Sequence, residues 1–292
     1  MGYNKPNLTK NAESNVKKSV QWLLSKPQDL LSDNTGTENI DVFYKQSILN
    51  RKGKVSGKQQ SVIDYIAQLL LCDSDCRLDF EKILGICRRD DKPYNNNHDG
   101  TLTRAQSNRV EERKAIEIWK KHKNKSIKGV GKILDYQVPL KDARADKSGK
   151  IDLLSYDEKD NILRILELKI YGNDSDSLLR TILEAETYKR VLINTHRKKK
   201  TDSCYGDGVS KLKVEYGIPS DARVVACPLL LIKEELLKYR WQFDKDKGNI
   251  GFRAYEEFCN PKDFEHVFKL ANSLQQEIII IYECSPDCFA KN

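Results

Sequence analysis

Two acidic residues and a lysine stand at regular spacing in the middle of the chain. Asp152 is followed fifteen residues later by Glu167, and Lys169 comes two residues after that. Because side chains alternate along a strand, and residues 157–161 predict a hairpin turn, we expect all three charges on one face of a sheet. Residues 162–171 are otherwise apolar enough for a central strand, where charges are costly unless they are paired with one another or with a metal ion.

These three residues have the composition of a site that hydrolyses phosphodiester bonds. Mg²⁺, or Mn²⁺ in its place, prefers carboxylate oxygens together with retained water and a substrate phosphate. We therefore expect Asp152 and Glu167 to hold such an ion, with the Leu168 carbonyl as a further ligand. The ion would lower the pKa of a bound water, which Lys169 would hold or help to deprotonate. The alternative interpretation is an exposed strand face on which Asp152 forms a cross-strand ion pair.

The order of these residues resembles that of the PD-(D/E)XK nuclease superfamily. The matching pattern is Gly-x-x-Asp on one strand, ending at Asp152, then a hairpin, then Glu-x-Lys on the next strand, from Glu167 to Lys169. The resemblance covers about residues 108–192. It implies a restriction-endonuclease-like fold, a catalytic role for these three residues, and DNA rather than RNA as the default substrate.

The same resemblance implies two more catalytic side chains on the flanking helices. Family members carry a further Glu on the helix before the first strand. We favour Glu112 as this acid and as a metal ligand, because Glu-Arg followed by apolar positions is similar to the helix of resolvase-like members; Glu111 is the alternative. Members similar to the RecB and Cas4 nucleases carry Gln-x3-Tyr on the helix after the Glu-x-Lys strand. Here Tyr188 matches the Tyr, and Glu184 stands in place of the Gln.

Hydrophobic periodicity divides the chain near residue 105. Before this point, apolar stripes predict helices between residues 8 and 89, and the polar stretch 88–108 predicts a linker or loop. Beyond it, short apolar runs alternate with helical segments, which is typical of an α/β domain with a mixed sheet. We therefore predict a helical N-terminal region at 1–105 and a nuclease-like domain at 106–292, with a restriction-endonuclease-like sheet flanked by helices. The expected strands are 133–140, 151–156, 162–171, 222–232 and 277–284, and the expected helices are 108–122, 177–194, 233–240 and 261–276.

An excess of basic residues favours a polyanionic partner. Lys and Arg number 51 against 43 Asp and Glu, a net charge of +8, and two basic clusters follow the helices on either side of the expected site. We predict that both contact nucleic-acid phosphates without reading sequence, although either one alone would also fit a solvated surface. The residues are Lys121, Lys123 and Lys125 in the first cluster and Arg197, Lys198, Lys199 and Lys200 in the second.

Two further functions remain open alternatives to catalysis. One is a catalytically inactive nucleic-acid-binding module on the same fold, and the other is an interaction protein with an ordinary mixed sheet. For the enzyme we expect nucleic acid as the partner, and a homodimer is compatible with the sequence.

The chain has no apolar run of membrane-spanning length and no apolar segment of a secretory signal near its first residue. We therefore expect a cytoplasmic protein without a membrane partner. In that compartment its eight cysteines are expected to be reduced thiols. The alternative is a zinc or iron–sulfur site built from Cys72, Cys76, Cys284 and Cys288.

Overall fold

The computed structural model describes residues 11–25, 43–86, 99–101, 109–123, 125–140, 150–171, 176–193, 208–233, 253–283 and 289–290. Its helices are α1 (Glu13–Leu24), η2 (Phe43–Lys45), η3 (Ser47–Asn50), α2 (Val62–Cys72), α3 (Ser74–Ile86), α5 (Val110–His122), α6 (Leu178–Ile193), α7 (Gly208–Glu215), α8 (Arg253–Phe258) and α9 (Glu265–Ser273). Its strands are β1 (Ser126–Ile127), β2 (Gly131–Pro139), β3 (Lys150–Asp157), β4 (Ile162–Ile170), β5 (Arg223–Lys233), β6 (Ile279–Glu283) and β7 (Phe289–Ala290).

The predicted α/β fold with a mixed sheet is confirmed. The described strands form one sheet in chain order, β1 to β7. Strands β1 to β4 are antiparallel neighbours, whereas β4, β5 and β6 are parallel. A parallel pair needs a crossover connection, and the connection from β4 to β5 contains α6 and α7. The chain order around the expected site is therefore helix, antiparallel strands, helix, parallel strand.

The central strand β4 is buried on both sides, so each face of the sheet is covered by a helix. All nine residues of β4 are buried. Leu166 and Leu168 pack with Trp119 of α5 in one core. Leu163 and Ile165 pack in the other core, which includes apolar residues of α6. Side chains at odd-numbered positions of β4 therefore face α6, and those at even-numbered positions face α5.

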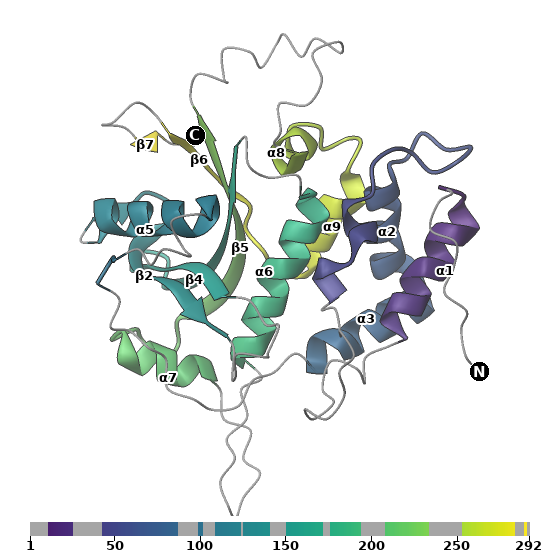
Figure 1. Cartoon of the computed structure of the whole chain (residues 1–292). Coiled ribbons are helices and arrows are strands. Elements are labelled where there is room, and N and C mark those ends of the chain that lie inside the picture. Colours follow the sequence, from purple (N-terminus) through teal and green to yellow (C-terminus); the bar gives the residue numbers. More distant parts are fainter. Residues whose placement is uncertain are drawn as a thin grey trace, which may run out of the picture.

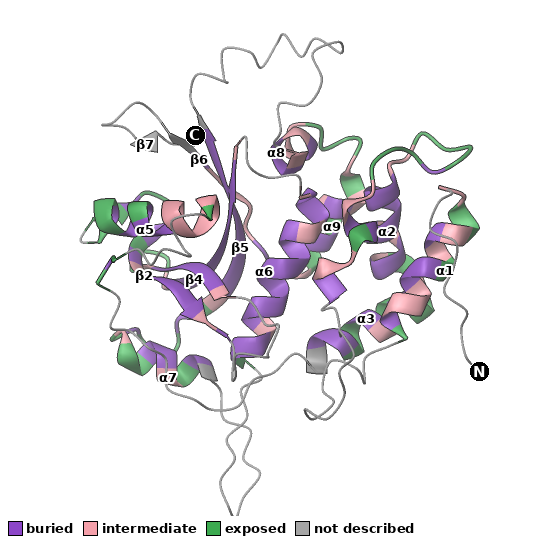
Figure 2. Ribbon diagram, viewed as in Figure 1, coloured by how far each residue is buried: buried purple, intermediate pink, exposed green. Residues whose placement is uncertain are grey.

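The N-terminal helices pack against the outer side of α6. Figure 1 shows α6 between the sheet and the group formed by α1, α2, α3 and α9, and α6 is buried along almost its whole length (Figure 2). Leu24 of α1 and Ile66 of α2 belong to the same core as Ile165 of β4. The expected boundary between residues 105 and 106 lies outside the described residues.

The first turn of α6 is fixed by side-chain acceptors on both sides. Glu257 of α8 accepts a hydrogen bond from the Leu178 amide at 2.7 Å, and Ser177 accepts one from the Arg180 amide at 3.1 Å. Such acceptors satisfy amides that the first turn of a helix leaves unpaired. The Ser177 hydroxyl in turn donates to the Leu49 carbonyl of η3. The N-terminal region thus helps to set where α6 begins.

Most expected elements appear within a few residues of their predicted ends, but some short ones were not predicted. These are α7, α8, β1, β7 and the turns η2 and η3. The prediction of a helix at 233–240 is wrong at residue 233, because Lys233 is the last residue of β5. Residues 234–240 lie outside the described residues. None of the described helices is long and apolar enough to cross a membrane.

Candidate active site

A buried cluster of carboxylates surrounds the ammonium of Lys169. Its Nζ lies 2.9 Å from Glu167, 3.3 Å from Glu184, 3.6 Å from Glu111 and 3.7 Å from Asp176. We call these five residues together with Asp152 the carboxylate cluster. Its members come from β3, β4, α5, α6 and the residue pair before α6, so the whole α/β core contributes to it.

Asp152 joins the cluster where strands β3 and β4 part. The β3–β4 ladder ends at the pair Leu153 and Leu166. One residue further on, the Asp152 carboxylate takes the place of a backbone partner, and its Oδ2 accepts from the Leu168 amide at 2.9 Å. Its Oδ1 accepts from Gln137 Nε2 at 2.9 Å. Asp152 therefore lies at the open end of the β3–β4 pair, where it interacts electrostatically with Glu167 and Lys169.

Glu167 carries an oxygen that accepts no hydrogen bond. Its Oε1 accepts from Lys169 at 2.9 Å, whereas its Oε2 is buried and lacks a donor. An unsatisfied buried carboxylate oxygen is costly. This atom is therefore open to a proton or to a cation, and a protonated Glu167 lies within hydrogen-bonding reach of Glu184.

The electrostatics of the acids differ across the cluster. Burial raises the pKa of Asp152 to about 6, against the opposing charge of Lys169. Burial raises the pKa of Glu167 well above its usual range, and the charges of Asp152 and Glu184 raise it further. Burial also opposes ionisation of Glu184, but the charge of Lys169 and the hydrogen bond from Tyr188 leave the pKa of Glu184 lowered. Glu167 is thus the acid that most needs a cation to ionise.

Tyr188 connects the cluster to the N-terminal region. Its hydroxyl donates to Glu184 Oε1 at 2.9 Å and lies 3.3 Å from the hydroxyl of Tyr44. The two rings pack edge to face, with centroids 5.8 Å apart. Burial and the charge of Glu184 raise the Tyr188 pKa well above its usual range, so Tyr188 acts here as a neutral hydrogen-bond donor.

The helix α5 brings Glu111 to the cluster. Glu111 is 3.6 Å from Lys169, whereas Glu112, the acid that the sequence favoured, pairs with Arg109 at 2.6 Å. The two acids are adjacent, and neighbours on a helix point about 100° apart. The contacts therefore select the alternative, Glu111, as the α5 acid of the site.

Several residues of the site had no signal in the sequence. Gln137 reaches Asp152 from β2, and Asp176 accepts hydrogen bonds from Asn50 and Arg180 as well as lying near Lys169. Asn50 comes from η3, more than a hundred residues away along the chain. No helix or strand periodicity connects Gln137 with Asp152 or Asn50 with Asp176, so only the folded arrangement reveals these contacts.

The chemistry of the cluster suits a hard divalent cation. Among the described residues, no three His, Cys, Asp or Glu side chains are already arranged as a ligand group, and Lys169 lies among the acids. The donor atoms are nevertheless carboxylate oxygens, the ligands that Mg²⁺ and Mn²⁺ prefer, and Glu167 Oε2 is an orphaned buried acceptor. Asp152 and Glu167 therefore fit the expected ion. A ligand role for the Leu168 carbonyl stays a prediction.

The predicted basic residues lie away from the cluster. Lys121, Lys123 and Lys125 are exposed and lie near the end of the sheet where β2 begins, since β1 starts at Ser126 and pairs with the first residues of β2. The cluster lies where β2 ends and α5 begins. Lys123 also lies over the ring of Trp119, 4.5 Å from its centroid. The other predicted set, Arg197, Lys198, Lys199 and Lys200, lies outside the described residues.

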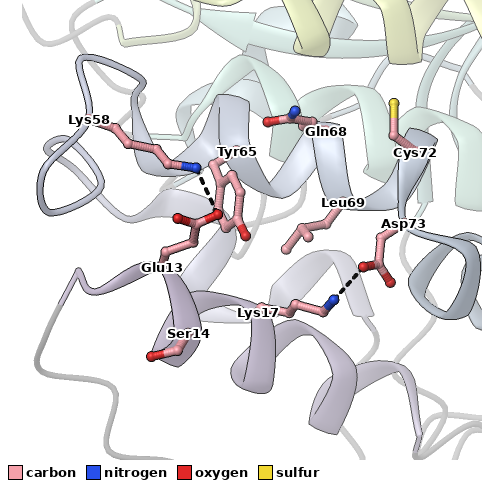
Figure 3. Close-up of a pocket in the computed structure, with 9 residues that line it drawn as sticks. All are labelled: Glu13, Ser14, Lys17, Lys58, Tyr65, Gln68, Leu69, Cys72 and Asp73. Atoms are coloured by element: carbon pink, nitrogen blue, oxygen red, sulfur yellow. Dashed lines mark hydrogen bonds and ion pairs between the residues drawn. The ribbon is translucent and has the colours of Figure 1, made fainter.

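A separate pocket lies between α1 and α2 in the N-terminal region (Figure 3). Its volume is about 690 Å³. Lys58 pairs with Glu13 at 2.7 Å, and Lys17 pairs with Asp73 at 2.5 Å, as the dashed lines in the figure mark. Because these charges neutralise one another, the pocket offers little to a charged substrate.

The cysteine alternative gains no support from the described residues. Cys72, which lines the pocket, and Cys76 are free thiols. Burial raises the pKa of Cys76 to about 12, which disfavours the thiolate that metals bind. Cys284 and Cys288 lie outside the described residues.

No protein-family model matches the chain, and no curated protein or solved structure shows significant similarity to it.

Proposed function

We propose that the protein is a cytoplasmic, Mg²⁺- or Mn²⁺-dependent nuclease of the PD-(D/E)XK type, which hydrolyses phosphodiester bonds of nucleic acid, with DNA favoured over RNA. The observation that carries the proposal is the meeting of Asp152, Glu167 and Lys169 where β3 and β4 part, with one Glu167 oxygen left unsatisfied. The helices α5 and α6 on opposite faces of the sheet support it, because each adds an acid to the same cluster.

Each residue has a role that follows from its surroundings. Asp152 and Glu167 hold the divalent ion, which when bound supplies positive charge to the phosphate and acidifies water. Lys169, already an ammonium donor to Glu167, hydrogen-bonds the attacking water or a phosphate oxygen and stabilises the charge that develops there. Glu111 adds negative charge from the α5 side. Tyr188 holds Glu184, and through it the position of Lys169.

The direct test is cleavage of a small substrate panel by purified variants. The panel contains circular, linear and single-stranded DNA and RNA, each with and without Mg²⁺. Asp152→Asn, Glu167→Gln and Lys169→Met are expected to lower the cleavage rate by about a hundredfold or more, the scale of a lost acid–base or charge-stabilising group. Glu117→Gln, on the exposed face of α5, is the control and should cleave like the wild type. Wild-type cleavage by any folded variant of the three would contradict the proposal.

A catalytically inactive nucleic-acid-binding module is the second candidate. It is favoured by one observation: Lys169 already neutralises Glu167 at 2.9 Å, so a protein that never binds metal could keep this arrangement. Calorimetry with Mn²⁺ separates the two functions. The nuclease binds Mn²⁺ and loses that binding in Glu167→Gln, whereas the inactive module binds nucleic acid but shows no Mn²⁺ binding that depends on Glu167.

A further inference from the structure

Gln137 has a backbone conformation that is unusual for its residue type and its place. It lies inside strand β2 and is buried, yet its φ is 51°. Residues other than glycine rarely adopt the left-handed region, which is strained for them, and such outliers persist only where the surrounding structure holds them. A buried strand residue in this state therefore needs a compensating contact.

This conformation changes which face of the sheet β2 presents. Side chains two residues apart in a regular strand share a face, but Tyr136 belongs to the core beneath α5 and Val138 to the core beneath α6. The partner strand β3 shows the same change. Leu153, which pairs with Tyr136, belongs to the core beneath α5, whereas Ile151, which pairs with Val138, belongs to the core beneath α6. Gln137 and Asp152 lie between these two pairs, where the side chains of both strands change from one face of the sheet to the other.

The contact at this point is between Gln137 and Asp152. The Gln137 amide donates to Asp152 Oδ1 at 2.9 Å, and the Leu168 backbone amide donates to Oδ2 at 2.9 Å. Two donors on different oxygens fix the rotation of the carboxylate. Both donors are neutral, so the charge of Asp152 is not cancelled by them, and each oxygen keeps a further lone pair.

We propose that Gln137 is a positioning residue of the metal site, whose strained backbone places its amide where it orients the Asp152 carboxylate toward a divalent cation. The inference rests on the proposed function, since it requires an ion at Asp152. Groups that orient metal ligands in this way typically contribute 10- to 100-fold to metal affinity.

The test measures the melting temperature and the Mn²⁺ affinity, which would both fall if Gln137 had a purely structural role. Gln137→Gly relieves the strain but leaves the buried Asp152 Oδ1 without its donor, and these two effects on stability oppose each other. We therefore expect a melting temperature close to that of the wild type and a Mn²⁺ affinity about 10- to 100-fold lower by calorimetry. Gln275→Gly is the matched control, because Gln275 is an exposed residue with φ 56° in the turn after α9. It should be at least as stable as the wild type and keep the wild-type Mn²⁺ affinity.

A second variant keeps the inference testable if the glycine variant does not fold. Gln137→Asn keeps a side-chain amide, and Asn tolerates the left-handed region. Its side chain is one methylene shorter than that of Gln, so the amide does not reach Asp152. It should show the same loss of Mn²⁺ affinity. Wild-type affinity in either folded variant overturns the role of Gln137 while leaving the proposed nuclease intact. Failure of both to fold assigns Gln137 to folding and also overturns the inference. A wild-type protein that binds no Mn²⁺ overturns the inference and the proposed function together.

Discussion

Lys169 is the residue on which the electrostatics of the site depend. Its ammonium is buried, and burying a charge is tolerated only when partners compensate the lost hydration. Here Glu167, Glu184, Glu111 and Asp176 lie within 3.7 Å of it. Arg180 also pairs with Asp176, and the raised pKa of Glu167 favours its neutral form. Glu184 and Glu111 still share one ammonium, so the cluster has residual negative charge that attracts a cation.

The two adjacent acids of α5 allow a sharp test at the residue scale. Glu111→Gln should lower Mg²⁺-dependent cleavage by about 10-fold or more, because Glu111 contributes negative charge to the cluster from 3.6 Å away. Glu112→Gln is the control with the same change one residue along, and it should lose only its pair with the exposed Arg109, a contact worth little. Initial rates at a sub-saturating Mg²⁺ concentration, where weaker binding of the ion lowers the rate, measure both. A larger loss of cleavage in Glu112→Gln than in Glu111→Gln would instead identify Glu112, the acid favoured from the sequence, as the α5 acid of the site.

The sequence predicted the residues of the site that lie in one local pattern. Asp152, Glu167 and Lys169 were found because a hairpin places positions fifteen and seventeen residues apart on one face. Tyr44 was not found, because its contact with Tyr188 is long-range. Gln137 lies only fifteen residues from Asp152, but its left-handed backbone breaks the strand alternation from which its orientation could be predicted. The choice between Glu111 and Glu112 depended on the exact rotation of α5 about its axis, which apolar periodicity fixes only to within about one residue.

At the scale of elements, the predicted order was sufficient for the fold, but the packing of α6 was not foreseen. The strong apolar runs at β3, β4 and β5 identified the strands because these are buried on both faces. The N-terminal helices were predicted, yet no pattern indicated that they pack on α6. Ser177 and Asn50 connect η3 to the start of α6, and Glu257 of α8 accepts from the same turn. These polar residues come from three separate segments, so no local pattern could indicate the arrangement.

Glu257 makes the start of α6 sensitive to pH. Burial raises the Glu257 pKa from 4.5 to about 7, even though Arg253 and the Leu178 amide oppose this. Between these values the folded protein keeps a proton that the unfolded chain has lost, so the free energy of unfolding falls as the pH rises from 4.5 to 7. The fall attributable to Glu257 is at most about 3 kcal/mol, since one pKa unit corresponds to 1.36 kcal/mol.

Glu257→Gln should remove this part of the pH dependence. Urea unfolding at a series of pH values is the measurement, and the curves of wild type and variant should diverge between pH 4.5 and 7. Glu265→Gln is the control on α9, where pairing with Lys269 lowers the pKa of an exposed acid, so any effect of that variant has the opposite direction. Parallel curves for wild type and Glu257→Gln would show that folding does not raise the pKa of Glu257.

At the scale of the whole molecule, the carboxylate cluster and the predicted nucleic-acid-binding lysines Lys121, Lys123 and Lys125 lie at opposite ends of α5. Glu111 lies in its first turn, and Lys121 in its last. Lys121 follows Glu111 by ten residues, which is a rise of about 15 Å along the helix at 1.5 Å per residue. Duplex DNA rises 3.4 Å per base pair, so this distance equals about four base pairs. A nucleic acid bound at the cluster must therefore extend beyond about four base pairs before it can reach Lys121, Lys123 and Lys125.

This separation predicts a dependence on substrate length. In a Glu167→Gln background, which prevents cleavage, the triple substitution of Lys121, Lys123 and Lys125 by Gln should weaken binding of a 20-base-pair duplex. It should also make the slope of log K against log salt shallower by about 2 to 3, since each phosphate contact contributes about 0.9. Fluorescence anisotropy at several KCl concentrations measures both. Binding of a short hairpin with a four-base-pair stem should not change. Equal losses for both lengths would place these lysines at the cluster itself, and no loss for either would show that the nucleic acid follows another face of the sheet.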